Sequence, residues 1–290
     1  MPALYLVPTP IGNLEDITLR ALRVLKGASL VAAEDTRTAR KLLSHYGIRQ
    51  RLLSYNEHNM RARTPQILAA LEHGDVALIS EAGTPGISDP GYELVQAAID
   101  AGSAVVPLPG ASAVLAAIVV SGLPARRFKF LGFLPRRPGE RRRLLESLKD
   151  ESATLIVFES PHRLRQTLAD IQSAWGDRRI AVCRELTKAF EEIFRGTLSQ
   201  ARGHFTEPRG EFTVVLEGAS DPAPAASLEQ AAADLRGLRA SGVSGRDAVR
   251  QVAKATGLPH RDVYRLWLER EQNAGENDRR QRSREGGEHS

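Results

Sequence analysis

Short runs of β-branched and apolar residues alternate with stretches of helical periodicity through most of the chain. The apolar runs are SLVAAE, VALIS, AVVPLP, TLIVFE, RIAVCRE and FTVVLEG, and the stretches between them include TRTARKLLSHYG and PHRLRQTLADIQSAWG. Gly47, Gly102 and Gly176 stand where helices are expected to end. This alternation predicts an α/β fold.

Two breaks in composition divide the chain. GLPA at residues 122–125 and the Pro/Ala/Ser-rich GASDPAPAAS at 218–227 read as boundaries. They predict an N-terminal α/β domain over 1–122, a second α/β domain over 123–220 and a helical module over 228–270. Turns at SGVSG and GLPH give this module a spacing like that of small helix-turn-helix modules. The polar tail, 271–290, has no periodicity, and we expect it to be disordered.

Three loops rich in glycine and proline follow predicted strands. They are PTPIGN after the first strand, EAGTPGISDPG after DVALIS, and PLPGASA later in the chain. Open α/β sheets bind ligands at the carboxyl ends of their strands, and glycine lets a backbone approach a ligand closely. Pro8 and Pro10 remove N–H groups that a phosphate site would use, and neither G-x-G-x-x-G nor G-x-x-x-x-G-K-[ST] is present. The loops therefore predict a pocket for a flat polar ligand such as an adenosine.

Composition narrows the class of protein. With 42% apolar and 26% charged residues, the 290-residue chain is typical of a globular protein. Its longest apolar run, AVLAAIVV, is far shorter than the roughly 18 to 20 residues of a membrane-spanning helix. No export signal precedes the first strand, and Cys183 is the single cysteine, so we expect a cytoplasmic protein. Neither H-E-x-x-H nor C-x-x-C occurs, so no metal site is predicted.

Positive charge is concentrated in one segment. The net charge is +5, and residues 126–149, RRFKFLGFLPRRPGERRRLLESLK, hold nine Lys or Arg but two Glu, with phenylalanines interleaved. Such a segment indicates contact with nucleic-acid phosphates, and the alternative is a solvated helix that keeps the protein soluble. The candidate RNA-binding residues are Arg126, Arg127, Arg136, Arg137, Arg141, Arg142 and Arg143.

Seven motifs in order carry a family resemblance. VPTPIGNLEDIT, AEDTR, SEAGTPGISDPG, PGASA, ESPHRL, RELTK and RGEFTVVLEG together resemble the RsmI family of ribosomal small-subunit RNA (cytidine 2′-O)-methyltransferases, in the tetrapyrrole-methylase superfamily. The resemblance runs from about residue 3 to 270. Glu81 stands where the family often has Asp, and Ala111 stands where it often has Pro.

The resemblance implies a two-domain class III methyltransferase, usually a homodimer, with S-adenosylmethionine in the cleft between the domains. It implies methylation of the ribose 2′-hydroxyl of a decoding-region cytidine in small-subunit ribosomal RNA. We expect this RNA to be part of the assembled subunit, and naked RNA is the alternative. The loops around Gly83 and Gly110 would contact the cofactor, while the first loop would face the substrate and the reactive end of the cofactor. The candidate cofactor-binding residues are Pro8, Glu81, Ala82, Gly83, Thr84, Pro85, Ile87, Ser88, Asp89, Pro109, Gly110, Ala111, Ser112, Ala113, Phe158, Glu159, Gly210 and Thr213.

Catalysis of this kind depends on positioning and on a group that accepts the hydroxyl proton. The candidate catalytic residues are Lys188, Glu34, Asp35 and Glu185, from RELTK and AEDTR. Lys188 is preferred: with a lowered pKa it could act as a base, or as a cation it could stabilise an oxyanion. The alternative for each acid is a helix cap or an ion pair with Arg37 or Arg184.

Two other functions compete with this one. A tetrapyrrole methylase would share the fold, but those enzymes resemble one another in a V-G-x-G-P-G-D first loop, where this chain reads VPTPIGNL. A non-enzymatic RNA-binding protein would explain the basic segment but not the three pocket-like loops.

Overall fold

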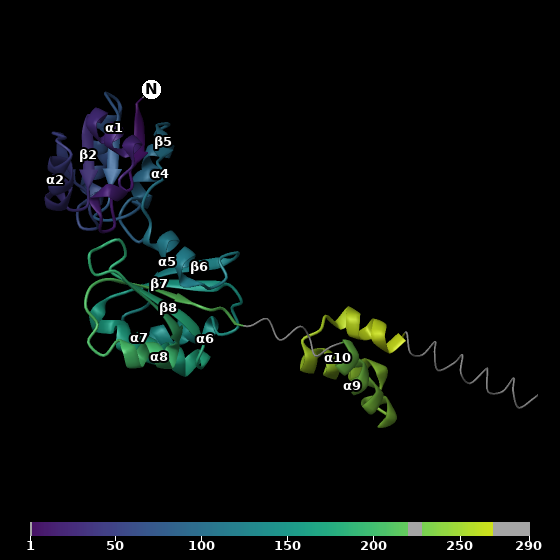
Figure 1. Cartoon of the computed structure of the whole chain (residues 1–290). Helices are drawn as coiled ribbons and strands as arrows, with labels where there is room; N and C mark the ends of the chain where they lie inside the picture. The colour runs from purple at the N-terminus through teal and green to yellow at the C-terminus, as the bar shows by residue number, and fades with distance from the viewer. Residues whose placement is uncertain (1, 220–227, 269–290) are drawn as a thin grey trace, which may run out of the picture. The chain divides into compact units, whose positions relative to one another are not determined.

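The computed structural model describes residues 2–219 and 228–268, and its chain divides into two compact units, Met1–Gly218 and Ala219–Ser290 (Figure 1). The larger unit contains two sheets and the smaller one is helical. In the described parts of the chain, no helix combines the length and apolar character needed to cross a membrane. The expected division of the larger unit at residue 122 stays a prediction.

The first sheet is wholly parallel, in the order β3-β2-β4-β1-β5. Its strands are β1 (Ala3–Leu6), β2 (Leu30–Ala33), β3 (Leu52–Ser54), β4 (Val76–Ile79) and β5 (Ala104–Pro107). The intervening helices are η1 (Leu14–Asp16), α1 (Leu19–Gly27), α2 (Thr36–His45), α3 (Met60–Leu71) and α4 (Tyr92–Asp100).

Both faces of this sheet are buried. Val31 and Ala77 belong to a core shared with α1 and α2, whereas Ala32 and Leu78 belong to a core shared with α3 and α4. Successive residues of a strand point to opposite faces, so strands covered on both sides read as the unbroken apolar runs seen in the sequence.

The second sheet is mixed, in the order β6-β7-β10-β8-β9, with β6 parallel to β7 and the other pairs antiparallel. Its strands are β6 (Phe128–Phe133), β7 (Thr154–Glu159), β8 (Arg179–Arg184), β9 (Glu192–Thr197) and β10 (Phe212–Leu216). The helices α6 (Pro138–Ser147), α7 (Pro161–Trp175) and α8 (Leu198–His204) cover one of its faces.

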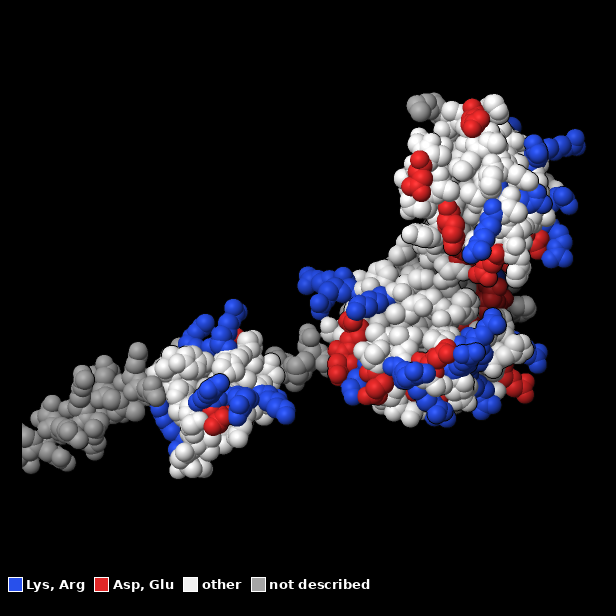
Figure 2. All heavy atoms as spheres, turned by 180° about the vertical axis from the view of Figure 1, so that it is seen from behind, with Lys and Arg blue, Asp and Glu red and all other residues white. Residues whose placement is uncertain are grey.

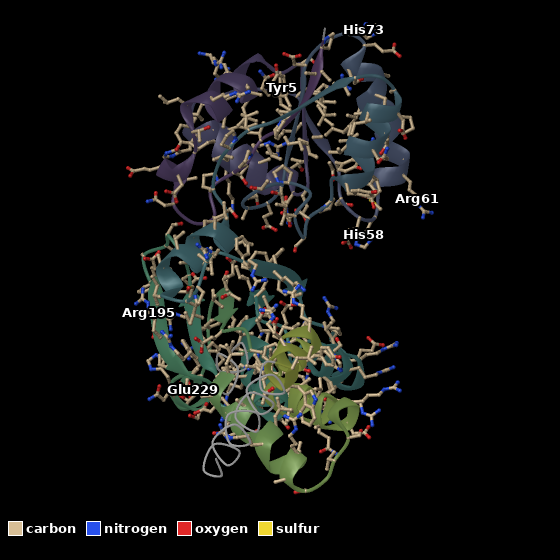
Figure 3. The ribbon with its side chains drawn as sticks, turned by 90° about the vertical axis from the view of Figure 1, so that its right-hand side faces the viewer. Tyr5, His58, Arg61, His73, Arg195 and Glu229 are labelled. Carbon is tan, nitrogen blue, oxygen red and sulfur yellow. The ribbon has the colours of Figure 1, made fainter. Side chains whose placement is uncertain are left out.

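Helix α5 (Ala113–Ser121) covers the other face of the second sheet. Its Val114, Ala117 and Ile118 pack with residues of β7, β8 and β10. Arg195 of β9, labelled in Figure 3, donates two hydrogen bonds to the Val120 carbonyl oxygen, at 2.8 and 2.5 Å. This helix begins in the third glycine-rich loop, so it joins that loop firmly to the second sheet.

The smaller unit contains α9 (Leu228–Ala240), α10 (Gly245–Thr256) and helical backbone at residues 260–268. The predicted tail, 271–290, and the linker residues 220–227 lie outside the described residues. The predicted fold class, α/β with a small C-terminal helical module, is confirmed.

Candidate functional site

A cavity of about 780 Å³ lies at the carboxyl ends of β1, β2 and β4. Residues from the second sheet and from the start of α5 complete its wall. This is the sheet edge at which the sequence predicts a pocket, because the first two glycine-rich loops begin at the ends of β1 and β4. The lining includes Thr9, Ile11, Gly12, Glu34, Ser80, Glu81, Gly83, Thr84, Asp89, Ser112, Phe133, Phe158, Cys183, Lys188, Glu211 and Thr213.

The first and second loops are joined by backbone hydrogen bonds. Thr9 and Gly83 each donate their N–H group to the other's carbonyl oxygen, both at 2.9 Å. Gly83 has a φ of +78°, in the region that favours glycine, and a Cβ built there would lie 3.4 Å from Ile11 Cγ2. The Gly83 N–H is therefore satisfied within the protein, and its loop offers other atoms to a ligand.

The third loop contacts both of the others. The Thr84 hydroxyl donates to the Ala111 carbonyl oxygen at 3.2 Å, which ties the second loop to the third. A Cβ on Gly110 would lie 2.5 Å from Cβ and 2.8 Å from Cγ of Pro8, so glycine is required there by the ring of Pro8. The three loops form one connected wall.

Most of the expected cofactor residues line the cavity. Those in its wall are Glu81, Ala82, Gly83, Thr84, Ile87, Ser88, Asp89, Ser112, Ala113, Phe158, Glu159 and Thr213. The wall does not include Pro8, Pro85, Pro109, Gly110, Ala111 or Gly210. Pro8 and Gly110 instead support the wall through their mutual contact.

Three carboxyl groups face the cavity from the first sheet. Glu34 accepts a hydrogen bond from the Glu81 N–H at 3.3 Å, and its pKa is raised by burial and by the nearby charges of Glu81, Glu57 and Asp35. Burial and the charge of Glu34 raise the pKa of Asp89 to about 6. Such a concentration of negative charge suits a ligand that carries positive charge.

Asp35 does not line the cavity. Its carboxylate caps α2 by accepting the Arg37 N–H at 2.7 Å, and it pairs with the Arg37 guanidinium at 2.9 Å. These hydrogen bonds lower the pKa of Asp35 to about 2. The geometry matches the alternative weighed for this residue, a helix cap and ion pair.

Lys188 lies in the cavity wall between two carboxylates. Its Nζ donates to Glu185 Oε1 at 3.0 Å and to Glu211 Oε2 at 2.8 Å. Burial opposes its charged form, but the hydrogen bonds with Glu211 and Glu185 outweigh burial and raise the pKa of Lys188. Lys188 is therefore a cation at neutral pH, and of the two roles open to it, the stabilisation of an oxyanion fits.

The loop that carries Lys188 is shaped by unusual backbone. Glu185 and Thr187 have φ values of 51° and 66°, a region that costs free energy for residues other than glycine. The Thr187 hydroxyl accepts the Asn13 N–H at 3.0 Å, and a Cβ on Gly12 would lie 2.3 Å from Lys188 Cγ. The first loop therefore holds Lys188 in place.

Glu185 supports Lys188 from outside the cavity wall. Its Oε1 accepts the Glu211 N–H at 2.8 Å, and a Cβ on Gly210 would lie 2.6 Å from its Cγ. Burial opposes the ionised form, but the hydrogen bonds from the Glu211 N–H and Lys188 lower the pKa of Glu185. Gly210 thus makes room for this carboxylate rather than for a ligand.

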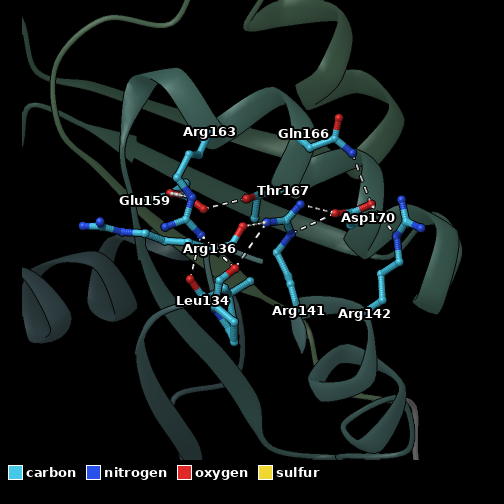
Figure 4. A network of polar contacts seen from close by, with 10 residues as sticks. Leu134, Arg136, Arg141, Arg142, Glu159, Arg163, Gln166, Thr167 and Asp170 are labelled. Atoms are coloured by element: carbon cyan, nitrogen blue, oxygen red, sulfur yellow. Dashed lines mark hydrogen bonds and ion pairs between the residues drawn. The ribbon is translucent and has the colours of Figure 1, made fainter. Parts of the chain in front are cut away.

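Glu159 and Arg141 belong to buried structural networks, shown in Figure 4. The Glu159 carboxylate accepts from the Ser160 N–H at 2.8 Å and from the Thr167 hydroxyl at 2.6 Å, and it pairs with Arg163 at 3.4 Å. Arg141 pairs with Asp170 at 2.5 Å, and their side chains are 4% and 5% exposed. The expectation that Arg141 contacts phosphates is wrong, because its guanidinium is enclosed by protein acceptors.

The other arginines of the basic segment remain at the surface. Arg126, Arg127, Arg136, Arg137, Arg142 and Arg143 are all exposed. Figure 2 shows that basic side chains over the second sheet's part of the molecule are interspersed with acidic ones. Arg137 pairs with Glu140 at 3.2 Å, and Arg142 pairs with Asp170 at 3.3 Å.

Several lining residues were not among the sequence candidates. Glu211 follows directly on the candidate Gly210, but the sequence gives no sign that it meets Lys188. Phe133 is an exposed aromatic residue at the end of β6, and its ring lies 5.7 Å from that of Phe158. Its place among the arginines of the basic segment is a signal that could have pointed to it.

The described residues contain no group of three or more His, Cys, Asp or Glu side chains that could hold a metal ion.

Comparison with known proteins places the chain in a family. Residues 3–202 match the Tetrapyrrole (Corrin/Porphyrin) Methylases. Ribosomal RNA small subunit methyltransferase I of Synechocystis sp. is 49% identical over 276 residues, which cover 93% of this chain and 99% of the relative. The protein of the same name from Halalkalibacterium halodurans is 46% identical over 271 residues, which cover 91% and 94%.

Solved structures agree on the fold. Uroporphyrin-III C-methyltransferase from Thermus thermophilus, in complex with S-adenosylhomocysteine, is 22% identical with a TM-score of 0.55, over 74% of this chain and 97% of that one. Cobalt precorrin-4 methyltransferase is 17% identical with a TM-score of 0.56, over 74% and 94%. The resemblance found in the sequence is confirmed: this chain is a methyltransferase that belongs to the tetrapyrrole methylases and, among them, to the family of ribosomal RNA small subunit methyltransferase I.

Proposed function

We propose that this chain transfers the methyl group of S-adenosylmethionine to the ribose 2′-hydroxyl of a cytidine in the decoding region of small-subunit ribosomal RNA. It would act in the cytoplasm, as a homodimer, on the assembled subunit. The observation that carries the proposal is the Lys188 cation, held by Glu185 and Glu211 in the wall of a cavity built from three glycine-rich loops.

The cavity fits this cofactor in size and charge. Its volume of about 780 Å³ is in the range typical of cofactor pockets. Glu34, Glu81 and Asp89 would complement the positive sulfur and amino group of the cofactor, and Phe158 and Ile87 would contact its apolar parts. When bound, S-adenosylmethionine supplies a methyl group activated by a positively charged sulfur.

The residues of the second sheet would position the ribose. Lys188, kept charged by its two carboxylates, would stabilise negative charge as it develops on the 2′-oxygen. Phe133, an exposed residue of the cavity wall, would offer its ring to the cytosine base, because unpaired RNA bases stack on aromatic side chains. In-line placement of the hydroxyl would supply most of the rate enhancement.

Glu34 would accept the hydroxyl proton. Its raised pKa brings it closer to neutral pH than an ordinary glutamate, which improves a general base. Asp35, committed to the cap of α2, would have no such role.

The test uses small subunits isolated from cells that lack the protein. The purified chain with S-adenosylmethionine should introduce a 2′-O-methyl group at one decoding-region cytidine, as mapped on the RNA. Lys188→Met should lower single-turnover methyl transfer about a hundredfold while S-adenosylhomocysteine affinity, measured by calorimetry, stays near that of the parent. Lys26→Met, which changes an exposed lysine of α1, should leave both unchanged.

Two results would contradict the proposal. Methylation of a porphyrin precursor in place of RNA would assign the chain to the tetrapyrrole branch of the family. Parental single-turnover transfer by Lys188→Met would remove Lys188 from the reaction.

A further inference from the structure

The helical unit contains two helices joined by a short turn, as helix-turn-helix modules do. Helices α9, α10 and the helix at 260–268 pack around buried Leu235, Val249 and Val263. Gly257, with a φ of 69°, ends α10, and its N–H donates to the Ala253 carbonyl oxygen at 3.0 Å. Only residues 257–259 separate α10 from the next helix, and a short turn with glycine is typical of this motif.

Trp267 fixes the rotation of the last helix about its axis. A Cβ on Gly245 would lie 2.8 Å from the Trp267 ring, so the start of α10 packs directly against the indole. The Arg239 guanidinium lies 4.3 Å from the centroid of the same ring. With Val263 fully buried as well, the residues at the opposite helical positions must face outward.

The outward face combines positive charge with an exposed aromatic ring. Its residues are Arg261, Tyr264, Arg265 and Leu268, all exposed. The side chains of Arg261 and Arg265 are 84% and 68% exposed, and both guanidinium groups lie 3.6 Å from the single carboxylate of Asp262. Exposed pairs of this kind are worth less than about 1 kcal/mol, so both arginines are available to another anion.

We propose that this face is a second RNA-binding surface, distinct from the cavity, in which Arg261 and Arg265 contact phosphates and Tyr264 stacks on an unpaired base. The proposal rests on the proposed function, which makes RNA the substrate. The major groove of an RNA duplex is too deep and narrow for a helix, so an unpaired segment is the form of RNA that this helix fits. Aromatic side chains stack on such bases without regard to sequence.

The helical unit as a whole carries more positive than negative charge, which favours an encounter with RNA at any of its surfaces. Blue side chains predominate over red on the view of the helical unit in Figure 2. The described basic residues of the unit are Arg236, Arg239, Arg246, Arg250, Lys254, Arg261 and Arg265, and its described acids are Glu229, Asp234, Asp247 and Asp262.

The experiment compares full-length variants in titrations with a labelled single-stranded oligoribonucleotide. Arg261→Gln/Arg265→Gln should weaken binding and reduce the slope of log affinity against log salt by about 1.4, or about 0.7 for each phosphate that is no longer neutralised. Tyr264→Ala should weaken binding about tenfold at an unchanged slope, because stacking carries no charge. Arg236→Gln/Arg250→Gln, which removes the same charge from α9 and α10, should leave affinity and slope near those of the parent.

Equal effects of the two double variants would overturn the proposal, since binding would then follow net charge alone. Tighter binding of duplex DNA than of RNA by the parent would overturn it too, because a recognition helix also fits the major groove of DNA. Matching thermal midpoints establish that the variants are folded.

S-adenosylhomocysteine affinity and methyl transfer at saturating RNA should be the same in Arg261→Gln/Arg265→Gln as in the parent. A parent protein that binds RNA at this face but transfers no methyl group would instead refute the proposed function.

Discussion

Lys188 owes its charge to carboxylates from two separate segments. Glu185 lies three residues before Lys188 in the same loop, and Glu211 lies directly before β10. Each carboxylate accepts one hydrogen bond from the Lys188 ammonium group. Burial by itself would lower the pKa of Lys188. The pair keeps a partly buried lysine charged, which suits the stabilisation of an oxyanion rather than the removal of a proton.

The burial of Asp89 costs the folded protein stability at neutral pH. Its pKa of about 6, against an ordinary 3.8, means that the folded chain binds this proton more tightly than the unfolded chain. The stabilisation from this proton is complete below the ordinary pKa and is lost as the pH rises through about 6. We expect Asp89→Asn to stabilise the ligand-free protein at pH 8 relative to the parent, and not at pH 4, in denaturant unfolding.

The same substitution should weaken the binding of a cationic cofactor. Asp89→Asn should lower S-adenosylmethionine affinity at pH 8 about tenfold, or about 1.4 kcal/mol, and affect S-adenosylhomocysteine less, because that molecule lacks the positive sulfur. Asp100→Asn, which removes the charge of an exposed carboxylate of α4 outside the cavity wall, is the control. An equal decrease in affinity for the two ligands would exclude a charge effect.

Gly110 is required by a proline rather than by a ligand. Its added Cβ would meet the Pro8 ring at 2.5 Å, so the first and third loops would have to separate. Gly110→Ala should lower the free energy of unfolding by about 1–3 kcal/mol, as overpacking does, and weaken S-adenosylhomocysteine binding through the displaced wall. Gly27→Ala is the matched control, since nothing lies within 4 Å of its added Cβ. Identical behaviour of the two variants would show that the loops tolerate the methyl group.

At the scale of elements, α6 is anchored by a buried ion pair. Arg141 pairs with Asp170 of α7 at 2.5 Å and also donates to the Pro135 carbonyl oxygen at 3.2 Å. Burial opposes ionisation of Asp170, but the hydrogen bonds from Arg141 and Arg142 outweigh it and lower the pKa of Asp170. Arg141→Met should cost about 3–5 kcal/mol in urea unfolding, because the buried carboxylate loses its one buried cationic partner and keeps only the exposed Arg142 and Gln166.

Arg142 provides the comparison within the same helix. It pairs with the same Asp170, but its own side chain is 66% exposed. Arg142→Met should therefore cost less than about 1 kcal/mol. Destabilisation of similar size in both variants would mean that burial does not decide the strength of these pairs.

The sequence predicts the buried strands better than the peripheral ones. β2, β4, β5, β7, β8 and β10 lie within the apolar runs singled out above. All of these except the edge strand β5 are buried along most of their length, because strands covered on both faces need unbroken apolar sequence. β3, β6 and β9 were not among them. β6 lies inside the basic segment, and most of its residues are only partly buried or exposed, so its composition resembles that of a surface.

Those residues of the cavity wall that lie within one loop can be predicted from the sequence, whereas contacts between different loops cannot. The sequence shows that the segment EAGTPGISDPG is rich in glycine and that it follows a strand. Most of its residues line the cavity. The contacts Pro8–Gly110 and Lys188–Glu211 depend on strand order, which no local pattern contains. The burial of Arg141 could have been predicted, because it stands four residues before buried Leu145, on the apolar face of α6.

At the scale of the whole molecule, the exposed arginines of the basic segment and the outward face of the helical unit are two candidate contacts with one RNA. Replacing Arg136, Arg137 and Arg143 with Gln should reduce the salt slope of binding to small-subunit RNA by about 0.7 to 0.9 for each phosphate that the variant no longer neutralises. Arg20, Arg23 and Lys26, all exposed on α1, give a control of equal charge. An unchanged slope would leave the basic segment as a surface that keeps the protein soluble.

Combining the two sets of substitutions tests whether both surfaces bind the same RNA. If they do, the slope reductions of Arg136→Gln/Arg137→Gln/Arg143→Gln and Arg261→Gln/Arg265→Gln should add, because each neutralised phosphate releases its counterions independently. Affinity should fall by more than in either variant alone, since each surface raises the effective RNA concentration at the other. If the combined variant instead shows the same slope as one of the two separate variants, only one surface binds at a time. The helical unit would then bind a different RNA segment from the one at the cavity.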